Sequence, residues 1–135
     1  MYYGSRVDDG TPTYDLRAVD DGGVDQLVSV LVAVGNAGTP DDFVLADHKG
    51  HAGSANSVMI FHDRALVLVG FGTDFPVNHT RDPAEAGLSL VSPANGGIGV
   101  QLYAGVFPSG RTPMFGPFSA DTVCWGTVTV AIPPP

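Results

Sequence analysis

The sequence has almost none of the long, straight-chain polar residues that cover exposed helices. Lys49 is its only lysine, Glu85 its only glutamate, and Gln26 and Gln101 are its only glutamines. These residue types are good helix formers, so their scarcity argues against a helical protein. Aspartate, which favours turns, supplies 13 of the 14 acidic residues, and valine, which fits strands, occurs 18 times. The absences and the abundances together predict a β-rich fold.

Cysteine and long apolar runs are also scarce. Cys124 stands alone between apolar neighbours, so no disulfide can form within the chain, and we expect a buried, inert thiol. No apolar run approaches the roughly 18 residues of a membrane span. The opening stretch "MYYGSRVDDG" lacks the basic and then apolar segments of a signal peptide. We therefore expect a protein that is not secreted by that route and does not enter a membrane.

Positive charge is in short supply. Six Lys and Arg residues face 14 acidic ones, and the net charge is −8. Such a chain repels phosphate backbones and anionic lipid surfaces, so we do not expect nucleic-acid binding. Six of the aspartates lie within the first 25 residues. They indicate either a solvated segment or an acidic arm that docks on a basic partner.

Motifs for catalysis are missing as well. There is no Gly-x-Ser-x-Gly elbow, and "GFGTDF" (residues 70–75) lacks the lysine and the following helix of a phosphate-binding loop. No pair among the aspartates is singled out as a glycosidase pair. We therefore expect no catalytic residues, no cofactor and no enzymatic activity.

Histidines attract attention in "DHKGH" (residues 47–51), with His62 and His79 following. A zinc or iron site needs three or four ligands that converge from rigid elements. His48 and His51 are three residues apart in a glycine-containing stretch, and the His-x-His pair and downstream glutamate of a cupin do not occur. The pattern predicts a polar loop with surface histidines and no metal site. A small metalloenzyme that uses these four histidines is the alternative.

The chain length and the numbers of glycines and prolines indicate the domain organisation. A chain of 135 residues makes one domain, and 18 glycines and 11 prolines indicate many short elements. We predict an acidic, extended arm over residues 1–26, a β-rich domain over 27–131, and a stiff proline-rich tail over 132–135. The expected fold is mainly β: an antiparallel β-sandwich or small β-barrel with one short helical turn and extended termini.

The expected strands follow from short apolar runs. "LVSVLVAV" (27–34) is apolar on both alternating sides and predicts a strand buried on both faces, with a short buried helix as the alternative. Residues 47–56 and 108–119 are expected as loops, and residues 57–62 and 65–71 as a hairpin turning at Asp63 and Arg64. Residues 81–87 are expected as a helical turn that ends at Gly87. Gly99 and Gly105 indicate a bulge or a close backbone approach. The remaining expected strands are residues 43–46, 88–92, 98–107 and 122–131.

Aromatic residues occur where a small monomer would not expose them. Tyr2, Tyr3 and Tyr14 lie in the expected arm, and Phe115 and Phe118 lie in the proline- and glycine-rich "MFGPF". We predict that these five residues form an interface with a partner chain. The alternative is that they fold back over the edges of the chain's own sheets.

Three segments resemble parts of the small decoration (cement) proteins of tailed-bacteriophage heads: "MYYGSRVDDGTPTYDL" as an arm, "LVSVLVAV" as an inner strand, and "VFPSGRTPMFGPF" as a contact loop. The lysine-poor composition is similar to that of a phage of actinobacteria. The resemblance implies a virion protein that assembles as a homotrimer in the host cytoplasm and clamps the major capsid protein. A tail or head–tail connector subunit fits the same idea. A β-sandwich that binds carbohydrate or protein through Trp125, Tyr103 and loop aspartates is the alternative class.

Overall fold

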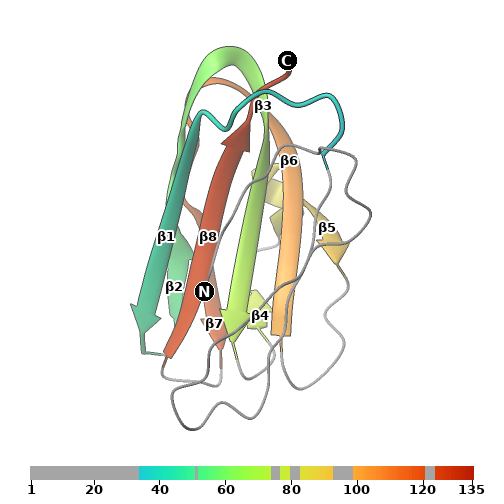
Figure 1. Ribbon diagram of the computed structural model, residues 1–135. Helices are drawn as coiled ribbons and strands as arrows, with labels where there is room; N and C mark the ends of the chain where they lie inside the picture. Colours follow the sequence, from blue (N-terminus) through green and yellow to red (C-terminus); the bar gives the residue numbers. More distant parts are fainter. Residues whose placement is uncertain (1–33, 51, 74–76, 80–82, 93–98, 121–123) are drawn as a thin grey trace, which may run out of the picture.

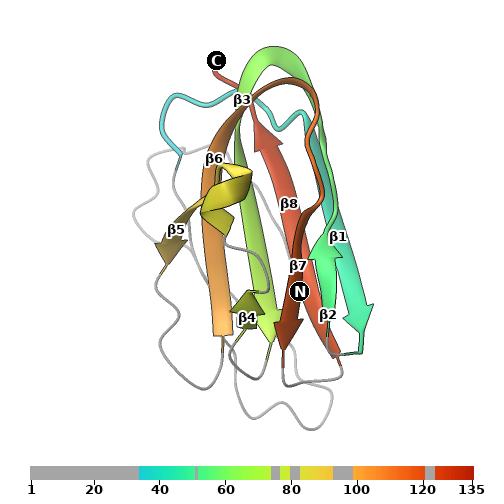
Figure 2. The same cartoon turned by 180° about the vertical axis from the view of Figure 1, so that it is seen from behind.

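The computed structural model describes residues 34–50, 52–73, 77–79, 83–92, 99–120 and 124–135, which form two packed antiparallel sheets (Figures 1 and 2). The larger sheet contains, in spatial order, β1 (Asp42–Lys49), β8 (Cys124–Ile132), β3 (Met59–Thr73), β6 (Gly99–Arg111) and β5 (Ser89–Ser92). The smaller sheet contains β2 (Ala52–Ala55), β7 (Phe115–Ala120) and β4 (Val77–His79), and one 3-10 helix, η1, spans Pro83–Ala86. The predicted mainly β, antiparallel sandwich is confirmed, and the described strands do not close into a barrel.

The strand order is that of a jelly roll. Strands β1-β8-β3-β6 lie in one sheet and β2-β7-β4 in the other, so successive strands repeatedly cross between the sheets. The departure is β5, which pairs with β6 at the edge of the larger sheet. The order places β1 beside β8, and the segment before β1 is also tied to the C-terminal tail, since Gly38 N donates to Pro133 O over 2.9 Å. The two ends of the described domain are thus held together.

The core lies between the sheets and is built by alternation along the strands. On β8, alternate residues point inward and are buried: Trp125, Thr127, Thr129 and Ala131. Alternate residues of β3 are buried in the same way. Phe71 of β3 is fully buried, and its ring centroid lies 4.2 Å from that of Phe118 on the opposite sheet. Aromatic contact across the sandwich therefore joins the two sheets.

One strand replaces the predicted hairpin over residues 57–71, and that prediction is wrong. β3 runs unbroken for 15 residues. Ile60 pairs with Gly110 and Arg64 with Pro108, so three residues of β3, 61–63, face one residue of β6. This irregularity is a β-bulge near the start of β3. Polar residues are tolerated there because the bulge is exposed. The polar Asp63 and Arg64 lie in the bulge, near which the ribbon of β3 arches over the end of the molecule (Figure 1), and the two parts of β3 pair with β6 and not with each other.

Both predicted loops contain strands. Residues 47–49 complete β1, and residues 52–55 form β2 after a turn at Gly50, whose φ is +90°. Residues 108–111 complete β6, and most of the remaining loop becomes β7. Polar or proline-rich strands of this kind are overlooked because they lack apolar alternation, whereas pairing with a neighbour decides their conformation.

Other local predictions are confirmed. The expected helical turn is η1, and Gly87 directly after it has a φ of +79°. The expected close approach occurs at Gly105, because a Cβ there would collide with the backbone oxygen of Gly87. Ile132, assigned to the tail, is the last residue of β8. The predicted arm and all of the predicted strand 27–34 except Val34 lie outside the described residues.

Candidate functional site

The outer face of the larger sheet is apolar, although only the inner face is needed for the sandwich core. Leu68, Leu102 and Val130 form an outer cluster there, and each is less than 10% exposed. Four partly buried residues pack against it: Val34, Leu66, Ala104 and Ile132. The antiparallel sheet of a sandwich usually turns a polar face to water. The outer cluster is therefore a second apolar layer, separate from the inner core.

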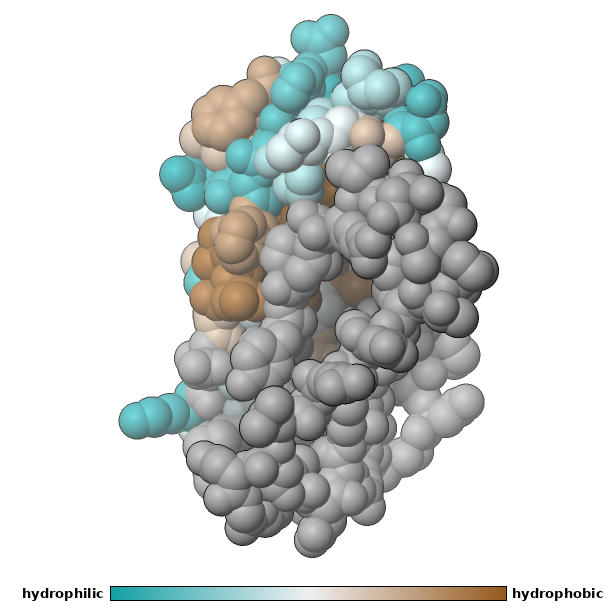
Figure 3. Space-filling model, in the orientation of Figure 1, coloured by the Kyte–Doolittle hydropathy of each residue, from teal (hydrophilic) through white to brown (hydrophobic). Residues whose placement is uncertain are grey.

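The margins of this face are exposed. On β1, Phe43 and Leu45 are 50% and 43% exposed, and they pair with Val130 and Val128 of β8. On β6, Val106 is 66% exposed and pairs with Leu66. Figure 3 shows hydrophobic side chains on this side of the molecule. The exposed apolar side chains on this face are therefore Phe43, Leu45 and Val106, and they are candidates for contact with another molecule.

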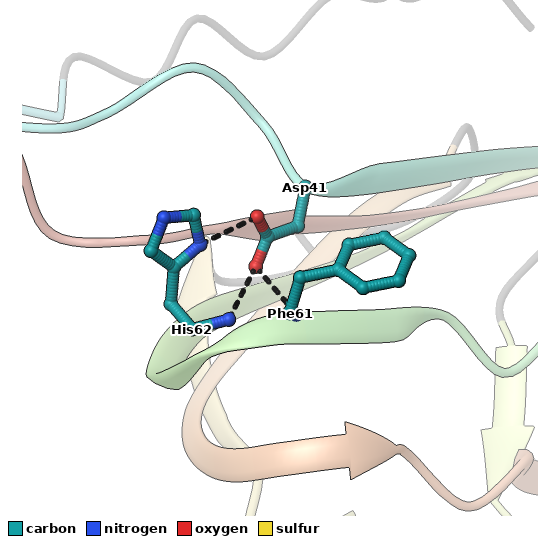
Figure 4. Close-up of polar contacts among 3 residues, drawn as sticks. All are labelled: Asp41, Phe61 and His62. Carbon is teal, nitrogen blue, oxygen red and sulfur yellow. Dashed lines mark hydrogen bonds and ion pairs between the residues drawn. The ribbon is translucent and has the colours of Figure 1, made fainter.

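A second exposed feature is the bulge of β3, and we call residues 61–64 the Phe61 tip. Phe61 is 72% exposed, and residues 62–64 are exposed as well. The Asp41 carboxylate, whose side chain is only 5% exposed, holds this bulge (Figure 4). Its Oδ2 accepts the backbone N–H groups of Phe61 and His62 over 3.0 and 3.4 Å, and its Oδ1 lies 2.7 Å from Nδ1 of His62.

The neighbouring carboxylate acts in the same way. Asp42 Oδ2 accepts the backbone N–H of Met59 over 2.9 Å. The bulge interrupts the ladder between β3 and β6, and the two aspartates supply acceptors for three N–H groups near the interruption. The geometry of the Phe61 tip is therefore set by the residues that enter β1.

A groove lies between η1 and the start of β7, and we call it the η1 groove. It has a volume of about 270 Å³. Leu88, Phe115 and Phe118 at its base are buried, whereas Met114 at its rim is 59% exposed. Glu85 is the one charged residue among the described residues that line it. The described residues that line it are Pro83, Glu85, Ala86, Leu88, Pro113, Met114, Phe115, Gly116 and Phe118.

The residues predicted for a partner interface are placed as follows. Phe115 and Phe118 are 0% and 1% exposed and belong to the inner core, and they also lie at the base of the η1 groove. The alternative, that they pack on the chain's own sheets, matches their position, because β7 faces the larger sheet and turns both rings inward. Tyr2, Tyr3 and Tyr14 lie outside the described residues.

Sequence reasoning missed the exposed apolar residues. Phe43 and Leu45 alternate with Val44, which packs on the inner core, so the β1 sequence is apolar on both faces. That signal was present in "FVLA", as it was in "LVSVLVAV". Phe61 gave a weaker signal, because a phenylalanine at the end of an apolar run resembles a core residue until the bulge is known.

The residues of the two alternative functions are also located. Trp125 is 4% exposed and its Nε1 donates to Gly50 O over 3.2 Å, and Tyr103 is 6% exposed and its hydroxyl donates to Gln101 Oε1 over 3.3 Å. Neither ring forms a surface on which a sugar stacks. Of the four histidines, His62 is engaged by Asp41, and the side chains of His48, His51 and His79 lie outside the described set. The described residues contain no cluster of three or more potential metal ligands.

Within the described ranges, no helix is long and apolar enough to cross a membrane.

Comparisons with protein-family models, with curated proteins and with solved structures find no match for this chain.

Proposed function

We propose that the protein is a structural subunit of a virion, most specifically a capsid decoration protein that stabilises the lattice of the major capsid protein. The observation that carries the proposal is the apolar outer face of the larger sheet, with Phe43, Leu45 and Val106 exposed at its margins. A protein with two apolar layers and exposed margins suits burial by other subunits. In this role it performs no reaction.

The fold is compatible with the proposal, but the same fold also occurs in proteins with other functions. Jelly rolls occur in viral capsid proteins, in lectins and in cupins. Fold alone therefore does not select a function. The lectin-like alternative loses its basis, because Trp125 and Tyr103 are buried. The assembly role is favoured since it uses the residues that are exposed.

The mechanism of stabilisation is burial of apolar area. Each Å² of apolar surface removed from water contributes about 25 cal/mol before the costs of association. Many copies on one lattice add avidity, so a modest contact per copy suffices. Phe43 and Leu45 are spaced for this use, since side chains two residues apart point to the same side of a strand.

The first test is cosedimentation of the purified protein with phage heads from the same source. We expect saturable binding at many copies per head, and loss of binding when Leu45→Asp places a charge on the exposed face. Lys49→Asp, a change of the same sign at the exposed end of β1, is the control. A tail or connector subunit would instead bind in a few copies at one site of the particle. A protein that stays in the supernatant with every particle preparation contradicts the proposal.

A second test concerns the N-terminal segment. Deletion of residues 1–20 is expected to abolish docking on heads while circular dichroism and the melting temperature remain those of a folded β protein. Unchanged occupancy of heads by the truncated protein would show that the acidic segment is not a docking arm.

A further inference from the structure

The Phe61 tip and the η1 groove are complementary features of one molecule. The tip presents an aromatic ring that is 72% exposed, and the groove presents an apolar base of Leu88, Phe115 and Phe118. We propose that the Phe61 tip of one copy docks in the η1 groove of the next copy. This proposal rests on the proposed role as an assembly subunit. It specifies how the subunits of the oligomer join.

The groove has the size and the lining for a phenyl ring. An apolar cavity of about 150 Å³ already holds benzene, and the groove measures about 270 Å³. Its base is provided by buried aromatic and aliphatic side chains and its rim by Met114, a flexible side chain that adapts to an inserted ring. A buried aromatic anchor in such a pocket is the usual centre of a strong protein interface.

The tip is organised before it binds. The Asp41 carboxylate accepts the N–H of Phe61 itself and of His62, and it contacts the His62 ring (Figure 4). These bonds fix the backbone that carries the exposed ring. Because little conformational freedom remains to be lost, docking costs less than it would for a free loop.

Charge favours the same pairing. Arg64 belongs to the tip and is exposed, whereas Glu85 is exposed at the groove. The chain carries a net charge of −8, so two copies repel each other in most orientations. A contact that brings an arginine of one copy to a carboxylate of the other selects this orientation over others.

The positions of the two features suit a ring of subunits. Asp41 immediately precedes β1 and holds the tip from that side, whereas η1 is followed by Gly87, which lies against Phe107 of β6. β1 and β5 are the two edge strands of the larger sheet, and η1 is the yellow helical turn near β5 and β6 in Figure 2. The tip and the groove are different patches of one chain, so their contact is head-to-tail, and such a contact closes into a ring when the rotation permits it. The expected homotrimer is such a ring.

The contact is tested by sedimentation velocity on the purified full-length protein. We expect one oligomer larger than the monomer. Phe61→Ala should weaken self-association by ~30-fold or more, the loss typical of an anchor residue, and Met114→Lys should also yield monomers. Val106→Ala removes an equally exposed apolar side chain outside both features and should leave the oligomer intact. Circular dichroism checks that each variant is folded, which is expected because all three side chains are exposed.

A mixing experiment identifies the head-to-tail geometry. The Phe61→Ala protein keeps its groove and the Met114→Lys protein keeps its tip, so their mixture should form a 1:1 dimer although neither associates alone. In the same way, Arg64→Glu should weaken the oligomer and the addition of Glu85→Arg should restore it. A mixture that remains monomeric, or a Phe61→Ala protein that associates like the unaltered one, overturns the contact. A monomer that still binds phage heads overturns the contact alone, and an oligomer that binds no particle overturns only the proposed virion function.

Discussion

Asp41 Oδ1 lies 2.7 Å from Nδ1 of His62, a residue 21 positions later in the chain. The other oxygen of the same carboxylate accepts two backbone N–H groups of the bulge, from Phe61 and His62. One side chain thus replaces the ladder bonds that the bulge removes from β3. The entry to β1 and the exposed turn of β3 are therefore one structural unit.

Asp41→Ala is expected to lower the free energy of unfolding by about 1–2 kcal/mol, because a charged acceptor of several hydrogen bonds is removed. His62→Ala should cost less than about 1 kcal/mol, since its side chain is 55% exposed and the pair is screened by water. Urea denaturation measures both values. Asp63→Asn, in the same exposed bulge, serves as the control and should change stability by less than about 0.5 kcal/mol. Equal losses in all three variants would show that Asp41 has no special role.

Phe118→Ala is expected to destabilise the fold by about 3–5 kcal/mol, because it leaves a cavity at the contact between the two sheets. Met114→Ala, a truncation only four residues away but at a side chain that is 59% exposed, should change the stability by less than about 0.5 kcal/mol. Thermal unfolding followed by circular dichroism compares the two. A Phe118→Ala protein with unchanged stability would contradict the core role of this ring and favour the prediction that it contacts a partner chain.

Thr129→Val is expected to stabilise the protein. Thr129 is fully buried, and its hydroxyl has no hydrogen-bond partner among the described residues. An unsatisfied buried polar group costs about 1–3 kcal/mol, and valine has nearly the same shape. The free energy of unfolding should therefore rise by up to that amount. Thr127→Val, at an inward position on the same strand, is the comparison and should not stabilise, because Thr127 is not without a partner. A loss of stability at Thr129 would reveal a hydrogen bond to its hydroxyl.

Trp125 offers a spectroscopic test, because it is the one tryptophan of the chain and is 4% exposed. Its emission should be blue-shifted in the folded protein and should shift to the red in denaturant. Titration with sugars should leave the emission unchanged. Emission typical of a hydrated indole, or quenching by a sugar, would favour the carbohydrate-binding alternative over an assembly subunit.

The strands that could be predicted are those with a local apolar signal. β1 contains "FVLA", and β5 and β8 contain most of "LSLVS" and of "TVCWGTVTVA", because apolar and β-branched residues favour a pleated surface wherever the chain places it. The helical turn was also readable, since Pro83 and Gly87 have local conformational preferences that no distant contact needs to supply. The β class of the fold follows from composition alone.

Long-range pairing decided the rest. Whether residues 57–71 form a hairpin or a single strand depends on β6 and on the Asp41 carboxylate, which are distant in sequence and supply the hydrogen bonds at the bulge. Phe115 and Phe118 occur in a proline-rich stretch, and only the opposite sheet makes them core residues. The exposed Phe61 and the groove beside η1 likewise exist only once the sheets are packed. Composition and periodicity determined that this chain forms strands; the tertiary structure decided which apolar side chains remain outside, because burial depends on what lies across from a residue.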